Sequence, residues 1–235
     1  MKKILTIILT CFLSLSLAGC SSKKNDDDIL TFFNALDNTL NLKSAQINGT
    51  LAMKDSKLNI DAQILQKDEL QVSSSIGLVA GKNVQNNFLN FYIKDGKTYL
   101  NSMGTKTQST VDKIGLKKNS KLNAYNPFLD LTDDQLCELF DSSKKENDTY
   151  TFKVNTSKLA TLLDNMGSVK LDHATLVATI KNEKISHMIL SFTGTQTVDD
   201  ASADIDVSIE LSIKKLYKIN FPNDLDNYKN ETAED

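Results

Sequence analysis

The chain has 235 residues and no arginine, so all 27 of its basic residues are lysines. A planar guanidinium can hold a phosphate or carboxylate through two parallel hydrogen bonds, whereas a lysine ammonium offers a point charge. Any anionic ligand would therefore be held by ammonium groups alone. The 30 acidic residues outnumber the lysines and leave a net charge of −3. This balance argues against a nucleic-acid partner.

Cysteine and histidine are also scarce, with three and two residues respectively. Cys11 and Cys20 lie near the N-terminus, which leaves Cys137 as a lone thiol, so we expect no disulfide framework. A lone cysteine without a nearby histidine is more often a small buried hydrophobe than a nucleophile. His173 and His187 are predicted on opposite faces of a hairpin, which argues against a shared metal site.

The motifs of common catalytic sites are missing as well. The sequence has no Gly-x-Ser-x-Gly, no phosphate-binding loop and no dinucleotide fingerprint. A group of four aspartates lacks the glycine and the closing glutamate of a calcium loop; its members are Asp199, Asp200, Asp204 and Asp206. We therefore expect no enzyme activity, no cofactor and no bound metal.

The one long apolar run lies at the N-terminus, where Met1-Lys2-Lys3 precedes the stretch from Ile4 to Leu17. This run falls short of the roughly 20 residues of a transmembrane helix and has the features of a signal peptide. Leu17-Ala18-Gly19-Cys20 resembles the lipobox of bacterial lipoproteins. That resemblance implies a lipoprotein signal peptide at 1–19 and a lipid anchor on Cys20 at the extracytoplasmic face of the cell membrane. The alternative is an ordinary signal peptide with a chance cysteine beside it.

The mature chain is expected to form a tether at 20–28, a single domain at 29–222 and a polar tail at 223–235. Ser21 to Asp28 offers no apolar residue to pack. An amphipathic helix is predicted over 29–42, because one set of apolar residues recurs at helical spacing; the set is Leu30, Phe33, Leu36 and Leu40.

Alternation of apolar and polar residues predicts antiparallel strands over 44–100. One face would carry Ile47, Gly49, Leu51, Met53, Leu58, Ile60, Ala62 and Ile64. Asp95-Gly96 predicts a type I′ hairpin in which Phe91 faces Leu100 and Tyr92 faces Tyr99. We expect a polar loop at 81–87, and a short strand followed by a mobile loop at 104–126.

Two short helices are predicted in the second half of the chain. Thr132 and Gln135 have the spacing of a capping box for a helix at 132–140. A strand at 149–155 precedes a helix capped by Thr156 or Ser157 and ended by Gly167.

Long strands are predicted in the last third of the chain. A hairpin around Asn182-Glu183 would pair 169–181 with 184–198 and place Leu176 opposite Ile189. Both of its faces carry apolar residues, so either both faces are partly covered or a bulge exchanges them. Strands at 203–213 and 217–221 complete the prediction.

This order of elements resembles the periplasmic lipoprotein-carrier family and its actinobacterial and Firmicute lipoprotein relatives. The resemblance spans most of residues 29–221 and rests on element order, without a diagnostic motif. It implies an α+β fold: a strongly curved antiparallel sheet (half-barrel), with the N-terminal helix and two short helices packed on its concave face. The Gram-negative carriers couple opening to ligand transfer through an arginine. A chain without arginine cannot use that mechanism, but the resemblance still implies an apolar pocket.

Two functions follow from these observations. The first is a monomeric, membrane-anchored protein that binds a lipid, an acyl chain or a lipoprotein anchor between the sheet and the helices. Its candidate ligand-binding residues are Leu89, Phe91, Ile93, Leu100, Leu176, Ile180, Ile185 and Ile189. The second is a non-enzymatic structural or interaction protein of the cell envelope with a filled interior. An open apolar pocket of about 300 Å³ or more would favour the first.

The lipobox predicts that Cys20→Ser blocks both cleavage at this site and acylation. Two acyl chains bury enough methylenes to hold a protein that one chain would release. Labelling cells with a clickable fatty acid checks this, with Cys137→Ser as the matched control that keeps its label. Continued labelling of Cys20→Ser would reject the assignment.

Overall fold

The computed structural model describes residues 25–163, 168–198 and 201–230. They fall into two compact units. Unit 1 comprises the described residues of 1–39 and 125–210, and unit 2 comprises those of 40–124 and 211–235. The signal peptide and Cys20 lie outside the described residues, and the single domain predicted over 29–222 stays a prediction. No helix among the described residues is long and apolar enough to cross a membrane.

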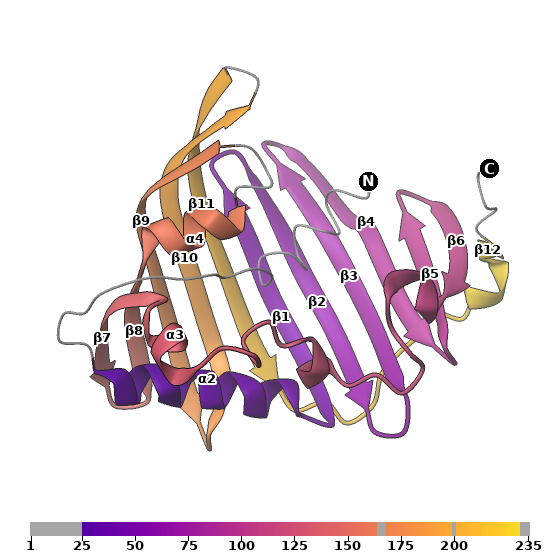
Figure 1. Ribbon diagram of the computed structural model, residues 1–235. Helices are drawn as coiled ribbons and strands as arrows, with labels where there is room; N and C mark the ends of the chain where they lie inside the picture. Colours follow the sequence, from indigo (N-terminus) through magenta and orange to yellow (C-terminus); the bar gives the residue numbers. More distant parts are fainter. Residues whose placement is uncertain (1–24, 164–167, 199–200, 231–235) are drawn as a thin grey trace. The chain divides into compact units, whose positions relative to one another are not determined.

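Unit 2 is built on a meander in which each strand pairs antiparallel with the next (Figure 1). Its strands are β1 (Ser44–Met53), β2 (Ser56–Gln66), β3 (Leu70–Ala80), β4 (Asn83–Lys94), β5 (Lys97–Ser102) and β6 (Thr105–Thr110). A two-residue strand, β12 (Lys229–Asn230), pairs with β6 in the parallel direction.

The register of β1 to β4 gathers apolar side chains on one side of the sheet. Ile60 pairs with Ile76, and Ile76 pairs with Leu89. Because residues two apart share a face, this register defines what we call the apolar face; its members are Ile47, Leu51, Leu58, Ile60, Ile64, Val72, Ile76, Leu78, Leu89 and Phe91. The alternation predicted from the sequence is confirmed.

The opposite face of the same strands is polar. The Asp61 carboxylate accepts hydrogen bonds from the side-chain amides of Asn48, at 2.6 Å, and Gln46, at 3.2 Å. A sheet with one apolar and one polar face needs cover on the apolar side only.

The hairpin between β4 and β5 is confirmed. Asp95 and Gly96 have φ angles of 55° and 76°, as a type I′ turn requires. Phe91 pairs with Leu100, and Tyr92 pairs with Tyr99.

The polar loop predicted at 81–87 is wrong, because β4 begins at Asn83. The sequence there is polar on both sides, yet its backbone continues the ladder with β3. The register shifts between Ile76 and Leu78. At Gly77 an added Cβ would lie 3.3 Å from the Asn86 carbonyl oxygen, so this irregularity brings the two backbones close together.

The mobile loop predicted within 104–126 is corrected as well. After the expected short strand, β6, the chain forms two 3₁₀ turns, η1 (Val111–Ile114) and η2 (Leu122–Tyr125). Val111 forms a buried cluster with Leu70 and Ile93, and Leu116 and Leu122 pack against that cluster. Scattered apolar residues in a polar sequence therefore anchor this segment, which covers one end of the apolar face.

The end of the chain also differs from the prediction. No strand forms at 217–221, where Tyr217 is 87% exposed. The predicted polar tail contains η3 (Leu225–Asn227) and β12, and Tyr228 packs edge-on against the ring of Tyr99. Burial, followed by the charges of Tyr92 and Asp224, raises the pKa of Tyr228 to about 12. Leu225 and Tyr228 form a buried cluster with Tyr99, which helps to hold this tail on the polar face of β4 and β5.

Unit 1 contains the helices. Its elements are α2 (Asp26–Leu40), α3 (Asp133–Cys137), β7 (Phe140–Glu146), β8 (Thr149–Val154), α4 (Thr156–Leu163), β9 (Ser168–Lys181), β10 (Lys184–Val198) and β11 (Ala201–Lys214). The last residue of α2, Leu40, and the end of β11 from Leu211 belong to unit 2. The strands lie in the order β11-β10-β9-β8-β7, and the pairs from β7 to β10 are antiparallel. The predicted fold class, an α+β protein with antiparallel sheet, an N-terminal helix and two short helices, is confirmed.

The N-terminal helix starts earlier than predicted, so residues 26–28 of the expected tether belong to its first turn. There the buried Asp28 accepts a hydrogen bond from Asn25 Nδ2 at 2.8 Å, and negative charge suits this end of the helix dipole. Phe32 packs its ring 5.3 Å from that of Phe152 on β8 and 6.0 Å from that of Phe140 on β7. Phe152 is fully buried, so this aromatic cluster forms a filled core under the helix.

Both short helices have identifiable caps. The capping box of Thr132 and Gln135 is confirmed, but α3 ends at Cys137, and Phe140 begins a strand. Cys137 is buried, as expected of a packing residue. The cap of α4 is Asn155, whose side-chain oxygen accepts from the Lys158 amide at 3.1 Å, so the prediction of Thr156 or Ser157 is wrong. Gly167 lies outside the described residues.

The hairpin of β9 and β10 contains the bulge that the sequence left open. The predicted register holds for Ile180 and Ile185, then shifts at Ser186. Beyond the shift Leu176 pairs with Leu190, and Ile189 pairs with Val177. Ile189 therefore lies on the opposite face from Leu176, and its predicted place in the Leu176 row is wrong.

Gly96→Val should destabilise the protein by about 1 kcal/mol or more, because a β-branched residue does not tolerate its positive φ. Gly96→Asn is the matched control, since asparagine adopts this conformation at low cost. Urea unfolding compares the two variants with the wild type. Equal stability of the valine and asparagine variants would contradict the turn assignment.

Candidate ligand-binding site

The candidate residues on β4 and β5 lie in unit 2, and part of them is already covered. Ile93 is 2% exposed within the cluster of Leu70 and Val111, and Phe91 packs against that cluster. Leu89 and Leu100 are half-buried. The space around Ile93 is therefore filled by the protein's own side chains.

The candidate residues on β9 and β10 lie in unit 1. Leu176, Ile180 and Ile185 are buried, and Leu176 pairs with the fully buried Phe152. They are core residues of a packed unit. The apolar space predicted to join both groups of candidates stays a prediction.

The rest of the apolar face is less completely covered. Its residues away from the cluster are half-buried, although β2 and β3 are interior strands of the unit 2 sheet; they are Ile47, Leu51, Leu58, Ile60, Ile76 and Leu78. Apolar side chains on interior strands of a packed domain are normally buried. These six residues thus keep apolar surface that a further molecule could remove from water, at about 25 cal/mol per Å².

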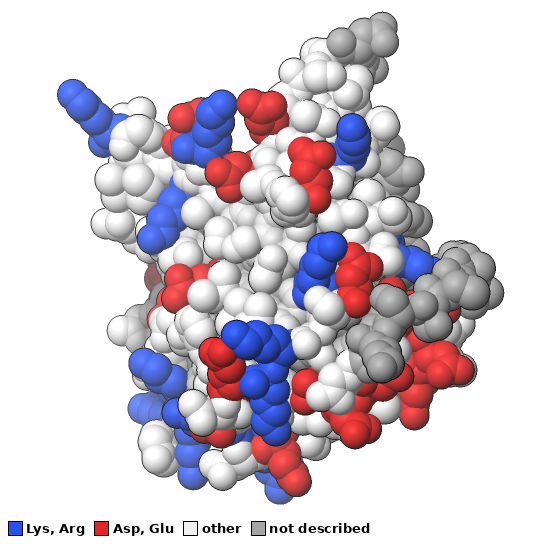
Figure 2. Space-filling model, turned by 90° about the vertical axis from the view of Figure 1, so that its left-hand side faces the viewer, with Lys and Arg blue, Asp and Glu red and all other residues white. Residues whose placement is uncertain are grey.

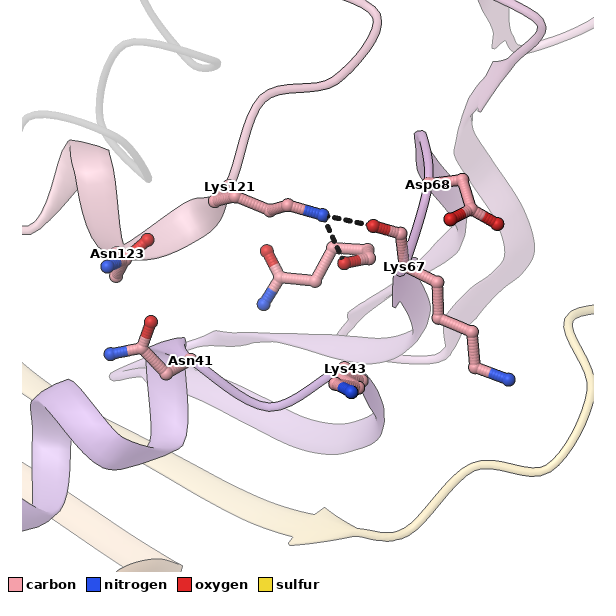
Figure 3. A pocket seen from close by; sticks show the side chains of 7 residues that line it. Asn41, Lys43, Lys67, Asp68, Lys121 and Asn123 are labelled. Carbon is pink, nitrogen blue, oxygen red and sulfur yellow. Dashed lines mark hydrogen bonds between the residues drawn. The ribbon is translucent and has the colours of Figure 1, made fainter.

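A pocket of about 660 Å³ lies in unit 2, at the end of β2. Its lining is polar, which differs from the apolar cavity predicted from the sequence; the residues are Asn41, Lys43, Gln66, Lys67, Asp68, Lys121 and Asn123. Figure 3 shows Asn41 and Asn123 on one side, Lys67 and Asp68 on the other, and Lys121 reaching between them. The volume is in the range of small-molecule sites.

Gln66 is the residue that builds this pocket. It is 5% exposed, and its side-chain amide donates to the carbonyls of Leu40, at 2.7 Å, and Leu42, at 2.6 Å. Its side-chain oxygen accepts from the Leu122 amide at 2.8 Å. One buried side chain thus joins the segment after α2, the end of β2 and the start of η2.

The pocket carries a positive charge. Lys43, Lys67 and Lys121 line it against a single carboxylate, Asp68. No ion pair found among the described residues includes any of these three lysines. Lys121 Nζ donates to the carbonyl oxygen of Gln66 at 2.6 Å and to that of Lys67 (Figure 3). An ammonium has three donors, so one N–H of Lys121 remains for a ligand.

The nearby Glu69 does not cancel this charge. Its carboxylate pairs with Lys118 at 3.0 Å and accepts from Gln71 Nε2 at 3.1 Å. The hydrogen bond from Lys118, and then that from Gln71, lower the pKa of the Glu69 carboxyl. The Glu69 carboxylate therefore interacts with groups that do not line the pocket.

Sequence reasoning missed this pocket because its residues come from three segments. The available signal was Gln66, a polar residue two positions beyond Ile64 on the apolar side of β2. Lys121 and Asn123 lie in a lysine- and asparagine-rich stretch that gives no sign of converging on it.

The histidines give no second site. The register shift at Ser186 pairs His187 with Thr179, and His173 pairs with Thr193, so both histidines lie on the same face of the hairpin and the prediction of opposite faces is wrong. His187 lies 3.7 Å from a carboxylate oxygen of Glu210, whereas His173 is exposed. Within 25–163, 168–198 and 201–230, no three His, Cys, Asp or Glu side chains form a group that could hold a metal ion. Figure 2 shows basic and acidic side chains interspersed with wide uncharged areas on the face that it presents.

Comparison with known proteins gives little support for a family. The chain matches no protein-family model and no curated protein. Among solved structures it is similar to LprF from Mycobacterium bovis, with 9% sequence identity and a TM-score of 0.43 over 86% of this chain and 99% of that one. A likeness of that degree carries no argument about ligand or family. The lipoprotein-carrier resemblance stays a prediction.

Gln66→Leu should lower the free energy of unfolding by about 2 to 4 kcal/mol, because two carbonyls and one amide lose a buried partner. Urea unfolding measures the change, with the exposed Gln85→Leu as the matched control. A loss in Gln66→Leu no larger than in the control would contradict the bracing role.

Proposed function

We propose that this protein is a non-enzymatic lipoprotein of the cell envelope, anchored through Cys20, that binds an apolar ligand on the apolar face of unit 2. The ligand class is a lipid, an acyl chain or the lipid anchor of another lipoprotein. The observation that carries the proposal is the half-buried state of six aliphatic residues on β1, β2 and β3.

The two units contrast in a way that supports this assignment. In unit 1 the aromatic cluster of Phe32, Phe140 and Phe152 fills the space between α2 and the sheet. In unit 2 the segment from Val111 to Leu122 covers only the end of the apolar face around Leu70 and Ile93. The remainder keeps apolar surface, with Ser74 as a polar residue among its aliphatic side chains.

The alternative is a structural or interaction protein whose interior is filled by its own side chains. Unit 1 and the Ile93 cluster fit this alternative. The half-buried side chains of Leu58, Ile60 and Ile76 do not fit this alternative, because a filled interior would bury them. The binding function therefore explains the part of the sheet that the scaffold function leaves without a reason.

Ile60→Asp should abolish or strongly weaken binding of dioctanoylglycerol, an uncharged lipid, to the full acylated chain. A carboxylate on this face must stay solvated or become neutral, and either opposes an apolar contact. Native mass spectrometry of protein released from neutral micelles measures the lipid-bound fraction. At least a tenfold loss of affinity is expected.

Asn59→Asp is the matched control, since it adds the same carboxylate one residue away on the exposed, polar side of β2. It should bind as the wild type does. If the wild type binds no dioctanoylglycerol, or if both variants lose binding equally, the binding function is rejected and the scaffold function replaces it.

A further inference from the structure

The polar pocket and the apolar face meet at the end of β2. Gln66, which lines the pocket, lies two residues beyond Ile64 on the same side of the strand. Leu122, between the pocket residues Lys121 and Asn123, packs against the same cluster as Ile64. Ile64 and Leu122 are only partly buried, so a molecule that enters the pocket has partly exposed aliphatic side chains beside it, and the uncovered part of the apolar face begins beyond them.

The dimensions suit a molecule with two chemically different ends. From Gln66 to Ile60 the strand advances six residues, which is roughly 20 Å at the usual rise. This strip of the apolar face is bordered by Ile47 on β1 and by Val72 and Ile76 on β3, and Leu51 and Leu78 continue it beside Leu58. Three lysines and one aspartate stand at one end of it, and aliphatic residues continue from there.

The positive charge of the pocket indicates which polar group of a ligand would bind there. Lys43 and Lys67 are exposed, and neither belongs to an ion pair found in the described part of the chain. Lys121 is held in place by two carbonyl oxygens and keeps one donor. Ammonium groups without carboxylate partners favour a phosphate, which accepts several hydrogen bonds and needs no planar fork.

We propose that the ligand of this protein is an anionic phospholipid, with its phosphate among Lys43, Lys67 and Lys121 and its acyl part along β1, β2 and β3. The inference rests on the proposed function and adds the class of head group to it. The phosphate fixes the orientation of the ligand, and the apolar contact supplies the burial.

The test compares two lipids that differ only in the phosphate. Dioctanoyl phosphatidic acid and dioctanoylglycerol are titrated into the full acylated chain in neutral micelles, and inorganic phosphate forms a third arm. Phosphatidic acid should bind the wild type roughly 30-fold more tightly than dioctanoylglycerol, as expected from two lysines beside an anionic group. Inorganic phosphate should bind more weakly than phosphatidic acid, because it lacks the apolar part.

Lys43→Gln combined with Lys67→Gln should remove most of that preference while leaving dioctanoylglycerol binding unchanged. The control is Lys57→Gln combined with Lys82→Gln. It removes the same charge from two exposed lysines, one at the far end of β2 and the other in the turn after β3. Circular dichroism confirms that both double variants are folded.

Four results would overturn the inference. Equal affinity for the two lipids, unchanged in the pocket variant, would reject the head-group site while the proposed function stands. Phosphate that binds as tightly as phosphatidic acid would show a site for a small anion only. An equal loss in the control variant would show unspecific attraction. Failure of both lipids to bind the wild type would reject the proposed function itself, and this inference with it.

Discussion

Antiparallel pairing of β1, β2 and β3 is the constraint on which the rest of unit 2 depends. Because side chains alternate in direction along a strand, a register without shifts between β1 and β2 puts most of their aliphatic residues on one side, with Leu65 as an exception on the other. A slip of one residue would move that set to the polar face. The apolar face, the end of β2 at Gln66 and the polar pocket all follow from this register.

Two kinds of cover protect the apolar side chains of this protein. Unit 1 uses a helix, and the rings of Phe32 and Phe152 meet at 5.3 Å beneath it. Unit 2 uses an irregular segment, held by Val111, Leu116 and Leu122, that reaches only one end of its sheet. The difference in cover, more than a difference in composition, separates the packed unit from the one that offers a surface for a ligand.

Because the chain has no arginine, the positive charge of the pocket comes from lysines alone. Lys43, Lys67 and Lys121 supply charge from three segments, and Gln66 holds those segments together through three buried hydrogen bonds. Buried polar groups are costly when they lose a partner. Gln66 therefore links the stability of the fold to the geometry of the charged site, although it need not touch a ligand itself.

Local features that depend on short-range physics could be predicted from the sequence alone. Alternation fixed the strands, Asp95-Gly96 fixed a turn that requires positive φ, and Thr132 with Gln135 fixed a capped helix start. Tertiary structure alone decided where the bulge at Ser186 exchanges faces, that Val111 and Tyr228 pack, and which lysines converge. Most of these outcomes depend on contacts between residues far apart in the chain, such as Lys121 with Gln66, 55 positions apart, and Tyr228 with Tyr99, 129 positions apart. Burial and backbone hydrogen bonds drive such contacts, and neither leaves a periodic signal in a polar stretch of sequence.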